Sequence, residues 1–166
     1  MANFSYCMNV HPADNYQDLI KNLENFALPI ANKVKSSGIM GVELHLNHVV
    51  AEEVLSKIEE FKTWLNKTKL QIFSINNYPL IDFHQKIVKE KVYLPDWSHQ
   101  ERVDSTITCA KILTHILQPG QSASISTLAG AYRYHPGFQK TSEICNNYLQ
   151  AFSAIHLLNQ KYKIHI

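Results

Sequence analysis

The chain has 166 residues, of which 45% are hydrophobic and 18% charged, and these values exclude a disordered or collagen-like protein. Its formal net charge is only +2, so charge gives no reason to expect nucleic acid or an anionic membrane as a partner. The length suits one domain with a full core. A closed (β/α)8 barrel usually needs roughly 250 residues, so this chain could form only part of one.

The cysteines and the N-terminus bear on the location of the protein. Cys7, Cys109 and Cys145 are odd in number and widely spaced, which favours a reducing compartment over a disulfide framework. The N-terminus lacks the basic start and apolar run of a signal peptide. No segment approaches the ~20 apolar residues of a membrane helix. We therefore expect a cytoplasmic protein that does not insert directly into a membrane.

The first half of the chain alternates strand and helix patterns. Asp14 and Asn47 are expected N-caps of two helices, and Pro29 is expected to kink or divide the first of them. The other bounds of the helices follow from apolar residues at helical spacing, and those of the strands from alternation of apolar and polar residues. The predicted elements are a strand at 4–10, a helix at 14–34, a strand at 41–46, a helix at 47–65 and a strand at 70–75.

The second half continues the alternation after a long loop. A capping box from Ser98 to Glu101 is expected to open a helix, which Pro119 and Gly120 end. The predicted elements are a loop at 76–97, a helix at 98–117, a strand at 122–128, a helix at 141–160 and the start of a fifth strand at 163–166. This order predicts an α/β fold with a parallel sheet.

Two architectures fit that order: a doubly wound sheet of five strands, and the N-terminal half of a TIM barrel. Strands covered by helices on both faces are nearly continuous hydrophobic runs. Here one face of each strand is small or polar, which favours the barrel and places this face in its lumen; chance alternation in short strands is the other explanation. The residues of that face are Ser5, Cys7, Asn9, His11, Glu43, His45, Ser74, Asn76, Ser122, Ser124 and Ser126.

The loop at 76–97 is far longer than the ~2–6 residues usual between a strand and a helix, and such insertions often bind ligands. In either architecture it lies at the C-terminal edge of the sheet, where ligands bind. Its polar side chains include Asn76, Asn77, His84, Lys89 and Glu90. The structural alternative is an excursion whose aromatic residues pack over the helices.

Motifs in this loop resemble the signature of the metabolite traffic protein EboE family, whose members are similar to xylose isomerase-like, sugar-phosphate isomerase/epimerase TIM barrels. Tyr6-Cys7 with Asn9 and His11-Pro12 is similar to the first strand of that family, and Ser124–Thr127 to its fourth. The loop motifs are Phe83-His84, Val88-Lys89-Glu90, Val92-Tyr93 and Pro95-Asp96-Trp97.

The resemblance implies that residues 1–166 are an incomplete TIM-barrel domain, with the first four βα units and the start of strand five. In related isomerases the metal-binding acids follow strands five to eight. We therefore expect no metal site within this chain, and a divalent metal only if a C-terminal half is present. The implied role is trafficking of a prenylated or other secondary metabolite from cytoplasm toward periplasm, with other Ebo-cluster proteins as partners.

Two sets of candidate residues follow. Catalytic roles are unassigned, with Glu43, His45, His84, Lys89 and Glu90 as candidates. The ligand-binding candidates, for a small metabolite or sugar-like molecule, are Asn9, His11, Asn76, Asn77, Tyr93, Asp96 and Trp97. Histidine pairs such as His45 and His48 lack any recognised metal-ligand spacing.

Three hypotheses remain open at this stage. The first is an EboE-like protein that handles a metabolite. The second is a sugar-phosphate isomerase or epimerase that uses a divalent metal. The third is a barrel that binds without catalysis, because a fold does not determine a function.

Overall fold

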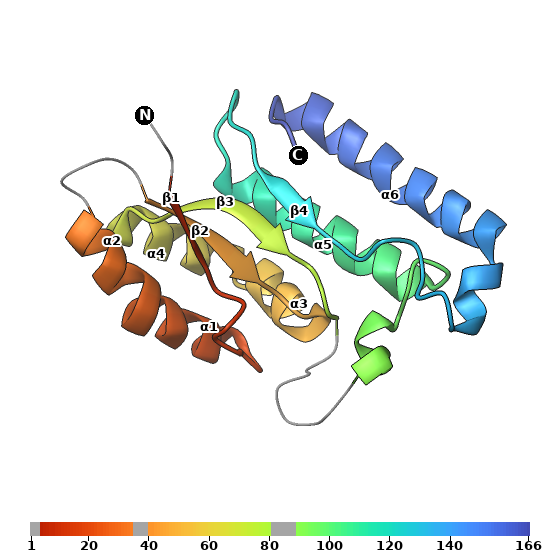
Figure 1. The fold of residues 1–166 in the computed structure, drawn as a ribbon. Helices are drawn as coiled ribbons and strands as arrows, with labels where there is room; N and C mark the ends of the chain where they lie inside the picture. The colour runs from red at the N-terminus through yellow and green to blue at the C-terminus, as the bar shows by residue number, and fades with distance from the viewer. Residues whose placement is uncertain (1–3, 35–39, 81–88) are drawn as a thin grey trace.

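The computed structural model describes residues 4–34, 40–80 and 89–166 and has an α/β fold (Figure 1). Its strands are β1 (Phe4–Cys7), β2 (Met40–His45), β3 (Gln71–Asn76) and β4 (Ser124–Ser126). Its α-helices are α1 (Tyr16–Asn22), α2 (Leu28–Val34), α3 (His48–Ser56), α4 (Ile58–Thr68), α5 (Gln100–Ile116) and α6 (Thr141–Tyr162). The shorter helical segments are the π-helix η1 (Leu23–Ala27) and the 3-10 helices η2 (Lys89–Tyr93) and η3 (Pro136–Gln139). The predicted α/β class is confirmed.

The four strands of the described chain form one parallel sheet in the order β1-β2-β3-β4. A doubly wound sheet reverses its strand order at a switch point, and the described strands show no reversal. The segment after α6 adds a parallel bridge between Ser122 and His165. Because β3 occupies the other side of β4, His165 lies on its outer side, where a fifth strand was predicted to begin.

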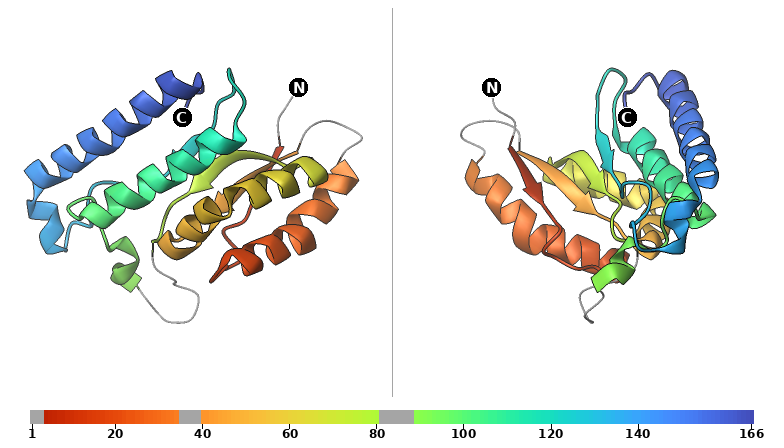
Figure 2. Two further views of the ribbon diagram at one scale, coloured as in Figure 1. Left: turned by 180° about the vertical axis from the view of Figure 1, so that it is seen from behind. Right: turned by 45° about the vertical axis from the view of Figure 1, so that its right-hand side comes forward.

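The two faces of the sheet differ in what covers them. The helices from α1 to α5 pack on one face, and α6 packs against α5 (Figure 2). Val42 and Leu44 point to the helices and are fully buried, whereas Glu43 between them is half-buried. We call the other side of the sheet, which bears Ser5, Cys7, Glu43, His45, Ser74, Asn76, Ser124 and Ser126, the open face.

Local sequence signals explain the first helices. Asn47 caps α3 as predicted, since its Oδ1 accepts from the Val50 amide at 2.9 Å. The expected cap at Asp14 is wrong by one position, because Asn15 accepts from the Asp18 amide. Pro29 has no amide hydrogen and its ring crowds the preceding turn. The helix widens into η1 immediately before Pro29 instead of ending there.

Four other predicted limits differ from the structure. The helix expected at 47–65 is divided at Lys57, which lies outside the helical region of φ and ψ. The strands expected at 4–10 and 122–128 are confined to β1 and β4. The expected capping box is absent, because the hydroxyl and amide of Ser98 both donate to Asp96 and α5 begins only at Gln100.

The hydrophobic core lies between the sheet and the helix layer, and a second cluster joins α5 to α6. Trp97 is the centre of this second cluster, which also holds Val103 and Ala151. The Trp97 indole N–H donates to the Leu128 carbonyl at 2.8 Å, and its ring stacks on Tyr148. No helix of the described residues combines the length and hydropathy needed to cross a bilayer.

We expect Trp97→Phe to lower the free energy of unfolding by about 2–3 kcal/mol, because it removes a buried hydrogen bond and leaves a void. Trp64→Phe is the matched control, since the Trp64 indole donates to the Glu24 carboxylate at the surface. Its loss should stay below about 1 kcal/mol. Urea unfolding at 25 °C measures both; equal losses would contradict the anchoring role of Trp97.

Candidate functional site

A carboxylate held by two strands forms the centre of the open face. The Cys7 thiol donates to Glu43 Oε1 at 3.1 Å, and the Ser74 hydroxyl donates to Glu43 Oε2 at 3.1 Å. The three residues are paired across β1, β2 and β3, so the sheet register itself brings them into one row. Both carboxylate oxygens are therefore fixed, and Glu43 is ready to accept further hydrogen bonds from a ligand.

A second polar row lies one step toward the C-terminal ends of the strands. His45 pairs in register with Asn76, and Asn76 with Ser126. Asn76 Nδ2 donates to Asn9 Oδ1 at 3.2 Å, so the two amides reach across β2. Asn9, Glu43, His45 and Asn76 are thus four predicted site residues that the structure brings together. Carboxylate, amide and imidazole groups in this arrangement suit a ligand that offers several hydroxyl groups.

The environment of the first polar row (Cys7, Glu43 and Ser74) changes the pKa of the Cys7 thiol. Burial raises the pKa of Cys7, the nearby Glu43 carboxylate raises it further, and a backbone hydrogen bond at Asn9 partly offsets both. A thiol is a nucleophile only as thiolate. Cys7 is therefore a hydrogen-bond donor to Glu43 rather than an activated nucleophile.

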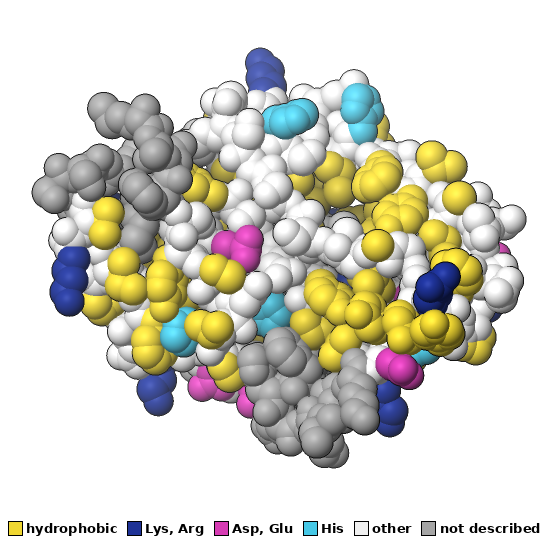
Figure 3. Space-filling model, in the orientation of Figure 1, with side chains coloured by type: hydrophobic (Ala, Val, Ile, Leu, Met, Phe, Trp, Pro, Cys, Tyr) yellow, Lys and Arg dark blue, Asp and Glu magenta, His cyan; other side chains and the backbone are white. Residues whose placement is uncertain are grey.

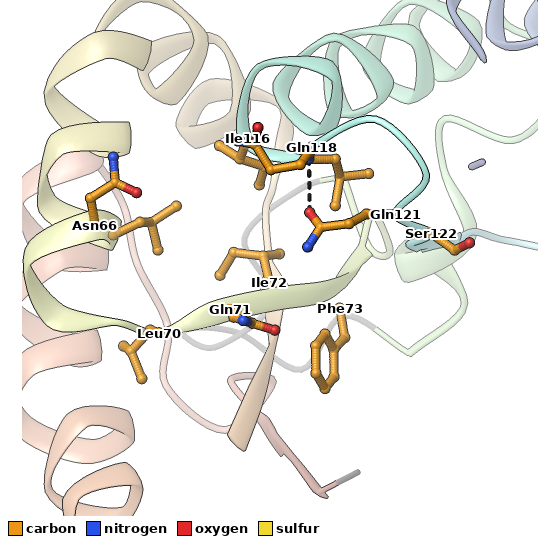
Figure 4. Close-up of a pocket in the computed structure, with 11 residues that line it drawn as sticks. Asn66, Leu70, Gln71, Ile72, Phe73, Ile116, Gln118, Gln121 and Ser122 are labelled. Atoms are coloured by element: carbon orange, nitrogen blue, oxygen red, sulfur yellow. Dashed lines mark hydrogen bonds between the residues drawn. The ribbon is translucent and has the colours of Figure 1, made fainter. Parts of the chain in front are cut away.

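At the N-terminal ends of the strands, the aromatic ring of Phe73 lies over the open face. A Cβ at position 41 would overlap the ring of Phe73, so only glycine fits beneath it. A cavity of about 350 Å³ lies at this end of the sheet, between the ends of α4 and α5, and Phe73 contributes to its lining. Ile72 and Gln121 line it, and Ile72 and Phe73 lie on opposite sides of β3 (Figure 4). This cavity faces the N-terminal ends of the strands, away from both polar rows.

Aromatic side chains gather at the C-terminal edge of the sheet. Tyr93 of η2 stacks on Tyr132 with ring centroids 4.7 Å apart, and Tyr78 lies 6.1 Å from Tyr93. The Tyr132 hydroxyl donates to Glu90 Oε1 at 3.5 Å. Two predicted residues, Glu90 and Tyr93, therefore belong to a group that joins two loops. Apolar side chains gather over these loops in the space-filling view (Figure 3).

His11 does not share the open face, contrary to the prediction from strand alternation. β1 ends at Cys7, and His11 turns back so that its Nε2 lies 2.7 Å from the Tyr6 hydroxyl. Its ring stacks on Phe26 of the helix layer at 3.9 Å, and burial lowers the pKa of this histidine. The alternation failed because the chain leaves the extended conformation before His11.

Three predicted ligand-binding residues are fully buried and bonded within the protein: Asn77, Asp96 and Trp97. Asn77 Nδ2 donates to the Leu46 carbonyl at 3.3 Å and to the Ser105 hydroxyl at 2.9 Å. Burial alone would raise the pKa of Asp96, but hydrogen bonds from Ser98 and His99 hold it below its usual value. The structure uses these three side chains in hydrogen bonds within the protein, at the two described ends of the loop.

The remaining candidates lie partly outside the described structure. His84 falls outside the described residues, and Lys89 is described only as the first residue of η2. Within the described residues, no group of three or more His, Cys, Asp or Glu side chains is placed to hold a metal ion.

Sequence reasoning missed Tyr132, Arg102 and His99. Tyr132 joins the aromatic group through a loop far from Tyr93 in sequence, so no local pattern signals the contact. Arg102 is fully buried and donates to the carbonyl of Asn77, a contact between distant residues that no local pattern signals. A local signal existed for His99, three residues after Asp96, a spacing that allows the two side chains to meet at a helix start.

Comparisons with known proteins identify no relative. No family model matches the chain, and no curated protein or solved structure matches it either.

We expect Glu43→Gln to speed alkylation of Cys7 about two- to fivefold at pH 7.5, because loss of the negative charge lowers the pKa of the thiol and increases the thiolate fraction. Mass spectrometry after iodoacetamide treatment measures the rate. Cys145 is exposed and serves as the reference within the same chain. An unchanged ratio of the two rates would contradict the interaction between Cys7 and Glu43.

Proposed function

We propose that the open face binds a small hydroxylated metabolite, and that the chain is the N-terminal part of a TIM-barrel-type protein related to the EboE family. On this proposal its role is to hold or pass on the metabolite. The observation that carries it is the polar set formed by Glu43, Asn9 and Asn76 on a face that none of the described helices covers.

The topology supports the barrel part of the proposal. A barrel is wound in one direction, so neighbouring strands are consecutive in sequence and its helices lie outside. The described strand order and the helix layer on one face have these properties. A cavity of about 540 Å³ between β4 and α6, with Ile166 in its lining, leaves room for a further strand beside β4.

The chemistry of the open face supports a neutral, hydroxyl-rich ligand. Amides both donate and accept, and the Glu43 carboxylate accepts only. No Lys or Arg side chain takes part in the described hydrogen bonds of Cys7, Glu43, Ser74, Asn9 and Asn76. Hydroxyl groups can satisfy amides and a carboxylate together, whereas an anionic head would face Glu43, which has no cationic partner in the described hydrogen bonds.

The second candidate is an isomerase or epimerase, favoured by the acid Glu43 and the imidazole His45 on the same side of one strand. Such a reaction moves a proton next to a carbonyl and needs a base within hydrogen-bond reach. Incorporation of solvent deuterium into a sugar phosphate would distinguish this candidate from binding alone.

We expect D-xylose, as a hydroxyl-rich probe, to shift backbone NMR signals of Cys7, Glu43 and Asn76 in a saturable way. Asn76→Ala should weaken this binding about tenfold, because it removes the bridge to Asn9 and a partner for the ligand. Chemical-shift titration gives the dissociation constant for each variant.

Asn66→Ala is the matched control, because Asn66 lies in the cavity at the opposite end of the sheet. Its affinity for the probe should be unchanged. Shifts confined to that cavity, or equal losses in both variants, would refute binding on the open face.

A further inference from the structure

A second cavity, of about 670 Å³, lies at the C-terminal edge of the sheet between the beginnings of α3 and α5. Its volume falls in the ~300–1,000 Å³ range of small-molecule sites. Val49, Leu80 and Leu94 contribute apolar walls, and His48 and His99 are its imidazoles. None of these residues belongs to the open face.

His99 is oriented by a buried carboxylate. Its Nδ1 lies 3.0 Å from Asp96 Oδ1, and Asp96 is fully buried. Since an ionised carboxylate only accepts hydrogen bonds, Nδ1 carries the proton and Nε2 offers its lone pair. The His99 side chain is 41% exposed and lines the cavity, and because Nδ1 faces the buried Asp96, Nε2 is the nitrogen left for a ligand.

The Asp96 pairing is not part of a hydrolytic triad. The Ser98 hydroxyl donates to Asp96 Oδ1 at 2.7 Å and lies 3.2 Å from His99 Nδ1. A nucleophilic serine would have to meet the opposite nitrogen, Nε2. Ser98 and Asp96 are therefore positioning residues, and His99 Nε2 stays available as an acceptor.

The charged side chains around the cavity determine which ligand charge it favours. Asp14 and Glu101 line it and are exposed, and no Lys or Arg among the described residues does. His48 Nδ1 is buried and has no hydrogen-bond partner within the described part of the chain. Carboxylates and a lone pair favour a positively charged donor, and the apolar walls favour a hydrocarbon body.

We propose that this cavity binds a small apolar amine, whose ammonium group donates to His99 Nε2 and whose hydrocarbon part packs against Val49, Leu80 and Leu94. The site is separate from the open face and does not depend on the function proposed for it.

The test is an NMR titration at pH 8 with three probes that share one ring: phenethylamine, phenethyl alcohol and 3-phenylpropionate. We expect phenethylamine to shift signals of His48, Val49 and His99 saturably, and 3-phenylpropionate to bind at least about tenfold more weakly, with the alcohol between them. Equal or tighter binding of the anion, or shifts elsewhere in the protein, would overturn the proposal.

His99→Gln should weaken phenethylamine binding about tenfold, and the matched control His115→Gln, on the last turn of α5 outside the cavity, should leave it unchanged. If His99→Gln does not fold, Glu101→Gln takes its place at the exposed rim and should weaken binding severalfold. Unchanged affinity in the folded variant would overturn the assignment.

Discussion

The hydrogen bonds of the buried Arg102 side chain hold the two described ends of the segment between β3 and α5. Its Nη1 donates to the Asn77 carbonyl at 2.7 Å, and its Nε and Nη2 donate to the Pro95 carbonyl at 3.1 and 2.9 Å. One side chain on α5 thus binds both ends of the segment. Burial lowers the pKa of Arg102 to about 10, and a buried charge persists only where such bonds satisfy it.

Both candidate sites depend on this arrangement. Asn77 directly follows Asn76, whose amide belongs to the open face, so fixing the Asn77 carbonyl fixes the end of β3. Pro95 directly precedes Asp96, whose carboxylate orients His99 at the second cavity. The two described ends of this segment are thus tied to the same helix.

The sequence was sufficient for the α/β class, the parallel sheet and the polarity of the open face, because these follow from alternation in strands and from apolar spacing in helices. Glu43, His45 and Asn76 were found in this way. The start of α5 was not, because Ser98 donates to Asp96 instead of capping the helix. The barrel and the EboE-like role remain proposals.

Two neighbouring asparagines show why a sequence pattern does not separate ligand-facing side chains from buried ones. Successive residues of an extended chain point to opposite sides, so Asn76, the last residue of β3, and Asn77 directly after it enter different environments although their side chains are identical. Asn76 reaches Asn9 across the open face, whereas Asn77 is buried against Ser105 of α5. The sequence criterion was a polar residue in a loop at the edge of the sheet. A side chain that binds a ligand and one that makes hydrogen bonds within the protein both meet it. Whether such a side chain faces a ligand or is bonded within the protein depends on where buried donors such as Arg102 lie. Their positions are set by packing between elements that are distant in sequence.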